Sequence, residues 1–335
     1  MEREQQPLPP LDAGLVLRPF VADDAQASLD LVNGISQVDE GRTRYTLAQI
    51  HSSWDSPGFD LSSDSLGAFD RDGRCLGEAE VYDTDVEHVR PLAFVGVHPA
   101  FRETPIGRHL LAFLDERLQE VPARAADGLR VAAVTIFMPD PTPMTALLRE
   151  WGWVEHRHYW TMAIDLPERP PEPDWPEGIT VRACTSADAP VLHRVENEAF
   201  ADHFGFEPRP FDVWHLALTE FLGSSPDMWF LAESEGEPAG MCVCALEQPD
   251  DPLAGSGYIA SLGVLRSHRG RGLGLALLRH GIASLYARGR RRVTLHVDSE
   301  SLTGATRLYD RAGMTVVRTS VAFERELRPG AGFPA

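Results

Sequence analysis

The stretch Val264-Leu-Arg-Ser-His-Arg-Gly-Arg-Gly-Leu-Gly274 decides the fold of the second half of this chain, because it joins two different patterns. Residues 258–264 form an apolar run typical of a buried strand, and apolar residues recur at helical spacing after the stretch. A glycine-rich turn into a helix N-terminus presents unpaired backbone N–H groups to one point, where they and the helix dipole attract an anion. Arg266, Arg269 and Arg271 add charged donors beside them. The stretch therefore predicts a pyrophosphate-binding loop.

The spacing of the glycines and the absence of lysine narrow the choice of ligand. Gly270, Gly272 and Gly274 alternate, so the third glycine does not fall where a dinucleotide-binding fingerprint requires it. All 31 basic residues are arginine, which excludes a Walker loop, a pyridoxal-phosphate Schiff base and the protein-kinase lysine. A different pyrophosphate ligand is therefore expected.

A second motif follows the loop. Residues 292–297 alternate like a strand, and Ala305-x-x-Leu308-Tyr309-x-x-x-Gly313 reads as a short helix closed by a glycine. Together with Arg269-x-x-Gly272-x-Gly274, this arrangement resembles the GNAT superfamily of N-acetyltransferases. The resemblance implies that the loop holds the pyrophosphate of acyl-CoA and that Tyr309 points at the CoA sulfur. A phenol with a pKa near ~10 can protonate a departing thiolate of pKa roughly 8.5.

The resemblance also implies where the rest of the cofactor lies. In the family the two central strands start paired and then separate, and the pantetheine arm enters the gap like an added strand. An amide of the first strand would face the thioester oxygen as negative charge develops on it. Acetyl-CoA is the expected acyl donor, and a longer acyl chain stays open. The residues assigned to CoA binding in this half are Leu262, Gly263, Val264, Arg269, Gly270, Arg271, Gly272, Leu273 and Gly274.

The acceptor side carries weaker signals. The family often places a glutamate near the start of the first central strand, as the base that deprotonates the incoming ammonium. Tyr258 stands there in this chain, so that role is open. Glu196, Glu198 and His203 lie in the first helices of the same half and are further candidates. For both carboxylates the sequence favours a solvated helix face, whereas an imidazole with a pKa near ~6.5 suits amine deprotonation.

The two halves of the chain look alike, which indicates a repeat. Residues 15–19 and 179–183 both read as opening strands, and Val97-x-x-x-x-Arg102 mirrors Val264-x-x-x-x-Arg269. We expect an α/β (α+β) fold of two tandem GNAT-like domains. Each would hold a mixed, mostly antiparallel sheet, flanked by helices and containing a splayed parallel strand pair. The expected boundaries are a flexible tail over 1–12, a domain over 13–166, a proline-rich linker over 167–177 and a catalytic domain over 178–330.

The first half differs where chemistry would occur. Pro105 replaces the loop glycine and removes one N–H donor, and Leu148 replaces the tyrosine. We therefore expect this half to be catalytically silent. It retains residues that could hold a second CoA as a structural ligand, namely Val95, Gly96, Val97, Arg102, Ile106 and Gly107.

Composition limits the remaining functions. The net charge of −19 argues against nucleic-acid binding and favours the approach of a cationic amine. No apolar run suits a membrane span or a signal peptide, so we expect a cytoplasmic protein. The expected oligomeric state is a monomer or a homodimer. The four cysteines and twelve histidines show no ligand spacing, so no metal is expected.

The expected function is direct transfer of an acyl group from acyl-CoA to the amine of a small metabolite. Two alternatives remain open from the sequence. One is a non-catalytic acyl-CoA-binding scaffold or regulator, and the other is a protein N-acetyltransferase.

Overall fold

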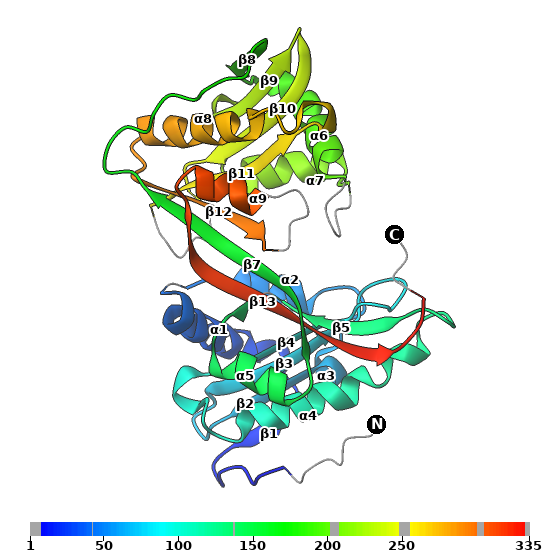
Figure 1. Cartoon of the computed structure of the whole chain (residues 1–335). Coiled ribbons are helices and arrows are strands. Elements are labelled where there is room, and N and C mark those ends of the chain that lie inside the picture. Colours follow the sequence, from blue (N-terminus) through cyan, green and yellow to red (C-terminus); the bar gives the residue numbers. More distant parts are fainter. Residues whose placement is uncertain are drawn as a thin grey trace. The chain divides into compact units, whose positions relative to one another are not determined.

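The computed structural model describes residues 8–41, 43–136, 138–201, 208–247, 255–299 and 305–331. The chain divides into two compact units, which we call the first unit and the second unit. The first unit comprises Met1–His158 with Ser320–Ala335, and the second comprises Tyr159–Thr319. Figure 1 shows that each unit contains a sheet with helices on both of its faces.

The sheet of the first unit has the order β1-β2-β3-β4-β5-β13, in which the β4–β5 pair is parallel and the other pairs for which a register is given are antiparallel. The short strand β6 pairs with β13. The strands are β1 (Val16–Arg18), β2 (Ser65–Phe69), β3 (Cys75–Tyr82), β4 (Leu92–Val97), β5 (Val131–Thr135), β6 (Met138–Pro139) and β13 (Thr315–Arg328). The helices are α1 (Ala25–Glu40), α2 (Leu47–Trp54), α3 (Leu61–Asp64), α4 (Ile106–Leu118) and α5 (Pro143–Glu150).

The second unit repeats this order as β8-β9-β10-β11-β12-β7, again with one parallel pair, β11–β12. Its strands are β7 (Val154–Asp165), β8 (Ile179–Ala183), β9 (Trp229–Ser234), β10 (Glu237–Ala245), β11 (Gly257–Val264) and β12 (Arg292–Asp298). Its helices are α6 (Ala189–Phe200), α7 (Phe211–Leu216), α8 (Leu273–Ala287) and α9 (Ala305–Arg311), with a π-helical segment at Ala217–Phe221.

The last strand of each sheet comes from the opposite half of the sequence. In the second unit, β7 pairs with β12 from Tyr159 to Asp165, whereas in the first unit the end of β13 pairs with β5. The domain boundaries expected from the sequence, 13–166 and 178–330, kept each final strand with its own half. The boundaries of the compact units differ from these because the two final strands pair in the opposite sheets. The alternation along a strand shows which face is apolar but not which sheet supplies the partner.

Helices bury the two faces of each sheet in separate apolar clusters. In the second unit, α8 and α9 cover one face, in a cluster that includes Leu277 and Leu295. Helices α6 and α7 cover the other face, in a cluster that includes Trp214 and Met241. In the first unit, α4 covers one face and α1 and α2 cover the opposite one. The second unit therefore has an α8 face and an α6 face, and these two names are used below.

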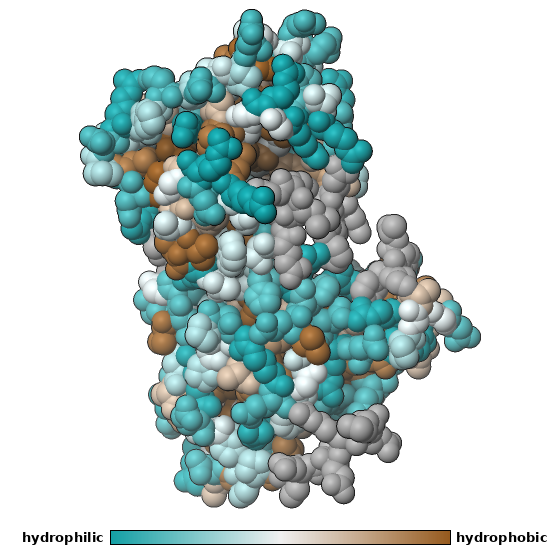
Figure 2. Space-filling model, viewed as in Figure 1, coloured by the Kyte–Doolittle hydropathy of each residue, from teal (hydrophilic) through white to brown (hydrophobic). Residues whose placement is uncertain are grey.

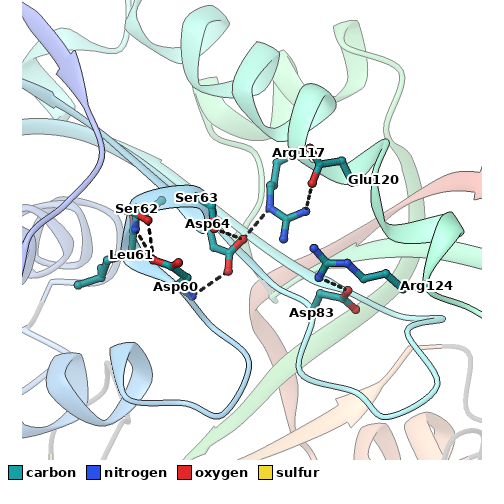
Figure 3. A network of polar contacts seen from close by, with 10 residues as sticks. Asp60, Leu61, Ser62, Ser63, Asp64, Asp83, Arg117, Glu120 and Arg124 are labelled. Carbon is teal, nitrogen blue, oxygen red and sulfur yellow. Dashed lines mark hydrogen bonds and ion pairs between the residues drawn. The ribbon is translucent and has the colours of Figure 1, made fainter.

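A buried ion pair joins two helices of the first unit. Figure 3 shows the Arg117 guanidinium on α4 directed at the Asp64 carboxylate at the end of α3. The Nε–Oδ1 distance is 2.6 Å and both side chains are buried, while Glu120 binds the same arginine from an exposed position. The backbone N–H of Asp60 donates a hydrogen bond to Oδ2 of Asp64 at 2.8 Å. A pair this deeply buried is costly to break, because either partner alone would be an uncompensated charge.

Hydrophilic residues cover most of the face shown in Figure 2, and hydrophobic residues form smaller groups among them. The four cysteines are buried with free thiols, as expected for core residues: Cys75, Cys184, Cys242 and Cys244. Within the described residues, no helix has the length and apolarity needed to cross a bilayer. In that same part of the chain, no group of three or more His, Cys, Asp or Glu side chains is arranged to hold a metal ion.

Candidate active site

The parallel strands β11 and β12 pair only where they begin. Their Cα partners are Gly257 with Val293 and Tyr258 with Thr294, and in the described chain this ladder extends no further. Three residues assigned to CoA from the sequence, Leu262 to Val264, lie on β11 beyond the paired part. The strands thus form a fork whose open end could admit an extended chain as an added strand.

The glycine loop leads from the end of β11 into α8. Gly270 and Gly272 have φ angles of +74° and +88°, in the left-handed region that favours glycine. Gly272 is the N-cap of α8 and has no side-chain cap, so the first N–H groups of this 15-residue helix face away from any intrahelical acceptor. Both glycines have open space where a Cβ would stand. The loop therefore has the geometry that an anion site at a helix N-terminus requires.

The other loop residues have different tasks. A Cβ on Gly274 would lie 2.8 Å from Leu308 on α9, so this glycine permits two helices to approach each other. The Leu273 side chain is buried in the core, so only its backbone could contact a ligand. Arg266 and Arg271 are exposed at the loop surface, where they could meet an anion.

Arg269 serves mainly to hold the loop. Its Nε donates to the Val264 carbonyl at 3.0 Å, and its Nη2 donates to the Ala199 carbonyl at 2.8 Å. The guanidinium therefore ties the end of β11 to the end of α6. The sequence placed all three arginines around the anion, and in the structure the Arg269 guanidinium also binds two backbone carbonyls.

Tyr309 lies on the α8 face, where it is 8% exposed. Burial raises the pKa of its phenol above the ordinary value, and the neighbouring Cys242 and Tyr258 raise it further. Its protonated form is thereby favoured, as a proton donor requires. The preceding residue, Leu308, packs on Gly274 at the start of α8. Consecutive residues of α9 thus reach both the glycine loop and the strand fork.

The predicted acceptor residues have different surroundings. Tyr258 lies at the last paired position of the fork, with its ring 5.8 Å from that of His296. Glu198 is exposed on α6, and His203 lies outside the described residues. The sequence favoured a solvated face for both glutamates of α6, and this was wrong for Glu196, which is 7% exposed. It shares the buried stripe of α6 with Leu192, Val195 and Ala199, a spacing that could have signalled its burial.

The first unit keeps the fork but changes the loop. Pairing between β4 and β5 joins Leu92 to Val134 and Ala93 to Thr135. Pro105 caps α4 with a φ of −63°, in place of the left-handed glycine of α8. The side chain at the tyrosine position, Leu148, is fully buried.

A small pocket of about 60 Å³, partly open to solvent, lies beside this fork. Four of the six residues predicted to hold a second CoA line it: Val95, Gly96, Val97 and Arg102. Arg102 is bound by the Asp39 carboxylate at 2.5 Å. The remaining two begin α4, where Ile106 is buried and a Cβ on Gly107 would lie 2.8 Å from Leu147.

Comparisons with known proteins agree with this geometry. The model of the Acetyltransferase (GNAT) family matches residues 192–314. The mycothiol acetyltransferase of Salinispora arenicola (strain CNS-205) is 32% identical over 268 residues, which cover 76% of this chain and 79% of that protein.

Two solved structures extend the likeness to nearly the whole chain. A GCN5-related N-acetyltransferase from Sphaerobacter thermophilus is 32% identical, with a TM-score of 0.72 and coverage of 97% of this chain and 99% of that one. A tandem GNAT protein from the clavulanic acid biosynthesis pathway, 16% identical, has a similar fold with a TM-score of 0.61, covering 95% of this chain and 100% of that one.

The chain belongs to the GNAT family of acetyltransferases. It is an acyltransferase with two GNAT units in tandem, and the co-substrate of this family is acetyl-CoA. The predicted fold class and enzyme class are confirmed.

Proposed function

We propose that the second unit transfers the acetyl group of acetyl-CoA directly to the amine of a small molecule. The observation that carries this proposal is the position of α9. Leu308 contacts the first turn of α8, where the diphosphate would bind, and Tyr309 lies beside Tyr258, where the strand fork opens. One short helix therefore links an anion site to a proton donor. The family match at residues 192–314, inside the second unit, supports the same assignment.

Each part of the site has a role in this reaction. The N–H groups at the start of α8, with Arg266 and Arg271, would hold the diphosphate. The strand segment from Leu262 to Val264 would hold the pantetheine arm, and one of its amides would stabilise the oxyanion. Tyr309 would protonate the CoA thiolate as the carbon–sulfur bond breaks.

The acceptor is proposed to be a small-molecule amine. The relative from Salinispora arenicola is named for mycothiol, a small-molecule product, and this favours a metabolite over a protein. A chain with a net charge of −19 also attracts cations, and amines carry a proton at neutral pH.

For the first unit we propose a silent domain that keeps a site for a second CoA. The pocket at Val95 to Val97 supports it, because these residues occupy the position that Leu262 to Val264 hold in the second unit. The ion pair between Arg102 and Asp39, together with Pro105, weakens the anion site relative to that of α8. Native mass spectrometry should find up to two CoA masses per chain, and it would also report the oligomeric state.

Release of CoA thiol from acetyl-CoA, measured with a panel of amines, tests the proposed activity. The panel should include the unacetylated precursor of mycothiol, small alkylamines and peptides with free N-termini. Turnover with small amines supports the proposal, and preference for peptides would favour a protein acetyltransferase. Tight acetyl-CoA binding without turnover by any member would favour the scaffold.

A further inference from the structure

Glu196 is a buried carboxylate on the acceptor side of the second unit. It lies on α6, which packs across β10 and β11, and the apolar residues Val195 and Ala199 accompany it in the buried stripe. A charged side chain rarely occupies such a stripe unless it is paired. Glu198, two residues along the same helix, is exposed. The two glutamates thus have opposite surroundings on one helix.

The polar partners of Glu196 are incomplete. Among the described residues, its Oε2 atom and the Nε1 atom of Trp214 are both buried without a partner at hydrogen-bonding geometry. The nearest Arg209 nitrogen is 3.9 Å from Oε1, at the limit of an ion pair. A buried carboxylate oxygen left without a donor carries a free-energy cost. A ligand N–H group would remove that cost.

Several groups set the charge of this carboxyl. Burial has the largest effect and raises the pKa of Glu196, whereas the side-chain donors of Trp214 and Ser261, which lie near the carboxylate, lower it. The charged or titratable neighbours are Arg209, from the segment before α7, and His193, one turn earlier on α6, and both lower it slightly. The net result is a raised pKa, which brings the group nearer to the range in which a general base works at neutral pH.

Contacts on β11 place Glu196 beside the expected thioester. A Cβ on Gly263 would lie 2.9 Å from Ala199, so the end of α6 rests directly on the strand segment that would hold pantetheine. Ser261, on the same face of β11, lies close enough to Glu196 to affect its pKa. Glu196 is one helical turn before Ala199, above this part of the strand.

We propose that Glu196 is the general base of the second unit, in place of the strand glutamate whose position Tyr258 occupies. This proposal rests on the proposed function. Glu196 accepts a proton from the acceptor ammonium, and the freed nitrogen attacks the thioester carbon. The carbon–sulfur bond breaks and Tyr309 protonates the thiolate. The tyrosinate then regains its proton from the amide nitrogen, and Glu196 releases one proton to solvent.

The first test is Glu196→Gln, with Glu237→Gln, an exposed carboxylate at the start of β10, as the control. With the panel amine that reacts fastest, we expect kcat/KM of Glu196→Gln to fall about 10²–10⁴-fold and to lose the acidic limb of its pH profile. Glu237→Gln should stay within about two-fold, and acetyl-CoA affinity should be unchanged in both. Wild-type activity together with an unaltered Glu196→Gln profile would overturn the inference while leaving the proposed function intact. A wild-type chain without turnover would instead overturn the proposed function.

Hydroxylamine provides a second test, because it is largely deprotonated at neutral pH and needs little base catalysis. The loss in Glu196→Gln should be much smaller with hydroxylamine than with an alkylamine. Equal losses would mean that Glu196 acts on the fold of the site and not on the proton. Melting temperatures separate these cases further, since Gln removes a buried charge and should not destabilise the chain at pH 7–8.

Discussion

The two units share one topology but bury their carboxylates in different places. In the first unit, Glu78 and Glu80 lie on β3, opposite Gly96 and Phe94 of β4. The equivalent residues of β10, opposite Gly263 and Ser261, are Met241 and Val243. Conversely, Val32 on α1 stands where α6 has Glu196, since each precedes by three residues the side chain that contacts the β4 or β11 glycine. The buried glutamates thus lie on a strand in the first unit and on a helix in the second.

The buried glutamates of the two units also have different surroundings. Glu80 accepts hydrogen bonds from the Trp54 indole at 2.7 Å and from the Tyr82 hydroxyl at 2.6 Å. Burial raises the pKa of both Glu78 and Glu80, which favours their protonated forms, and Oε2 of Glu78 is buried without a hydrogen-bond partner. Oε2 of Glu196 also lacks a hydrogen-bond partner, but Glu196 lies on the helix whose end packs on the strand that would hold pantetheine. The Glu80 carboxylate is thus held by side chains of the first unit's own core, whereas the role proposed for Glu196 is toward a ligand.

The largest effect is expected from Tyr309→Phe. Removing the proposed proton donor should lower kcat about 10²–10⁴-fold and change acetyl-CoA affinity less than about two-fold. Tyr286→Phe on α8 makes the same change where no proton transfer is proposed, and it should be nearly silent. Steady-state rates with a titration of acetyl-CoA measure both. An unchanged rate in Tyr309→Phe would remove the main catalytic contrast between the units.

Breaking the buried ion pair of the first unit should affect stability strongly. Arg117→Ala leaves the Asp64 carboxylate buried without its partner, and about 3–5 kcal/mol of unfolding free energy should be lost. Glu120→Ala removes the exposed partner of the same arginine and should cost less than about 1 kcal/mol. Urea unfolding monitored by circular dichroism measures both values. Similar small losses in the two variants would show that burial of this pair contributes little.

The contrast between the two loops can be tested at Gly272. Alanine at a φ of +88° is strained by about 1–2 kcal/mol, and its Cβ would enter the space where the diphosphate is expected. Acetyl-CoA affinity should fall about ten-fold. Gly289→Ala, at a φ of +89° and also facing open space, introduces the same strain after the end of α8. If Gly289→Ala weakened binding equally, backbone strain and not the anion site would explain the effect.

The smallest effect is expected from Glu78→Gln, and it depends on pH. The pKa of Glu78 is raised, so the folded state favours its protonated form and loses stability as pH rises above about 4.3, the unfolded value. The free energy of unfolding of the variant should therefore exceed that of wild type by about 1 kcal/mol at pH 8 and by nearly nothing at pH 4. Glu116→Gln, on the exposed side of α4, should show no such trend. If the variant instead lost the same unfolding free energy at both pH values, Glu78 would stabilise the fold through its hydrogen bond to Ser28.

Much of the second unit could be predicted from the sequence because its signals are local. The turn at Gly270 and Gly272 needs φ angles that glycine favours, and the apolar periods on either side identify a strand and a helix. The spacing around Tyr309 identified the second motif. The tandem arrangement followed from the same signals repeated in the first half.

The sequence by itself therefore determined the strand–loop–helix unit, its repetition and the position of the tyrosine, because each depends on residues close together in the chain. Only the tertiary structure decided that β7 and β13 exchange sheets, that Arg269 binds backbone carbonyls and that Glu196 is buried while Glu198 is exposed. Strand pairing, carbonyl contacts and burial depend on neighbours that are distant in sequence. Those neighbours are set by packing, which no local pattern records.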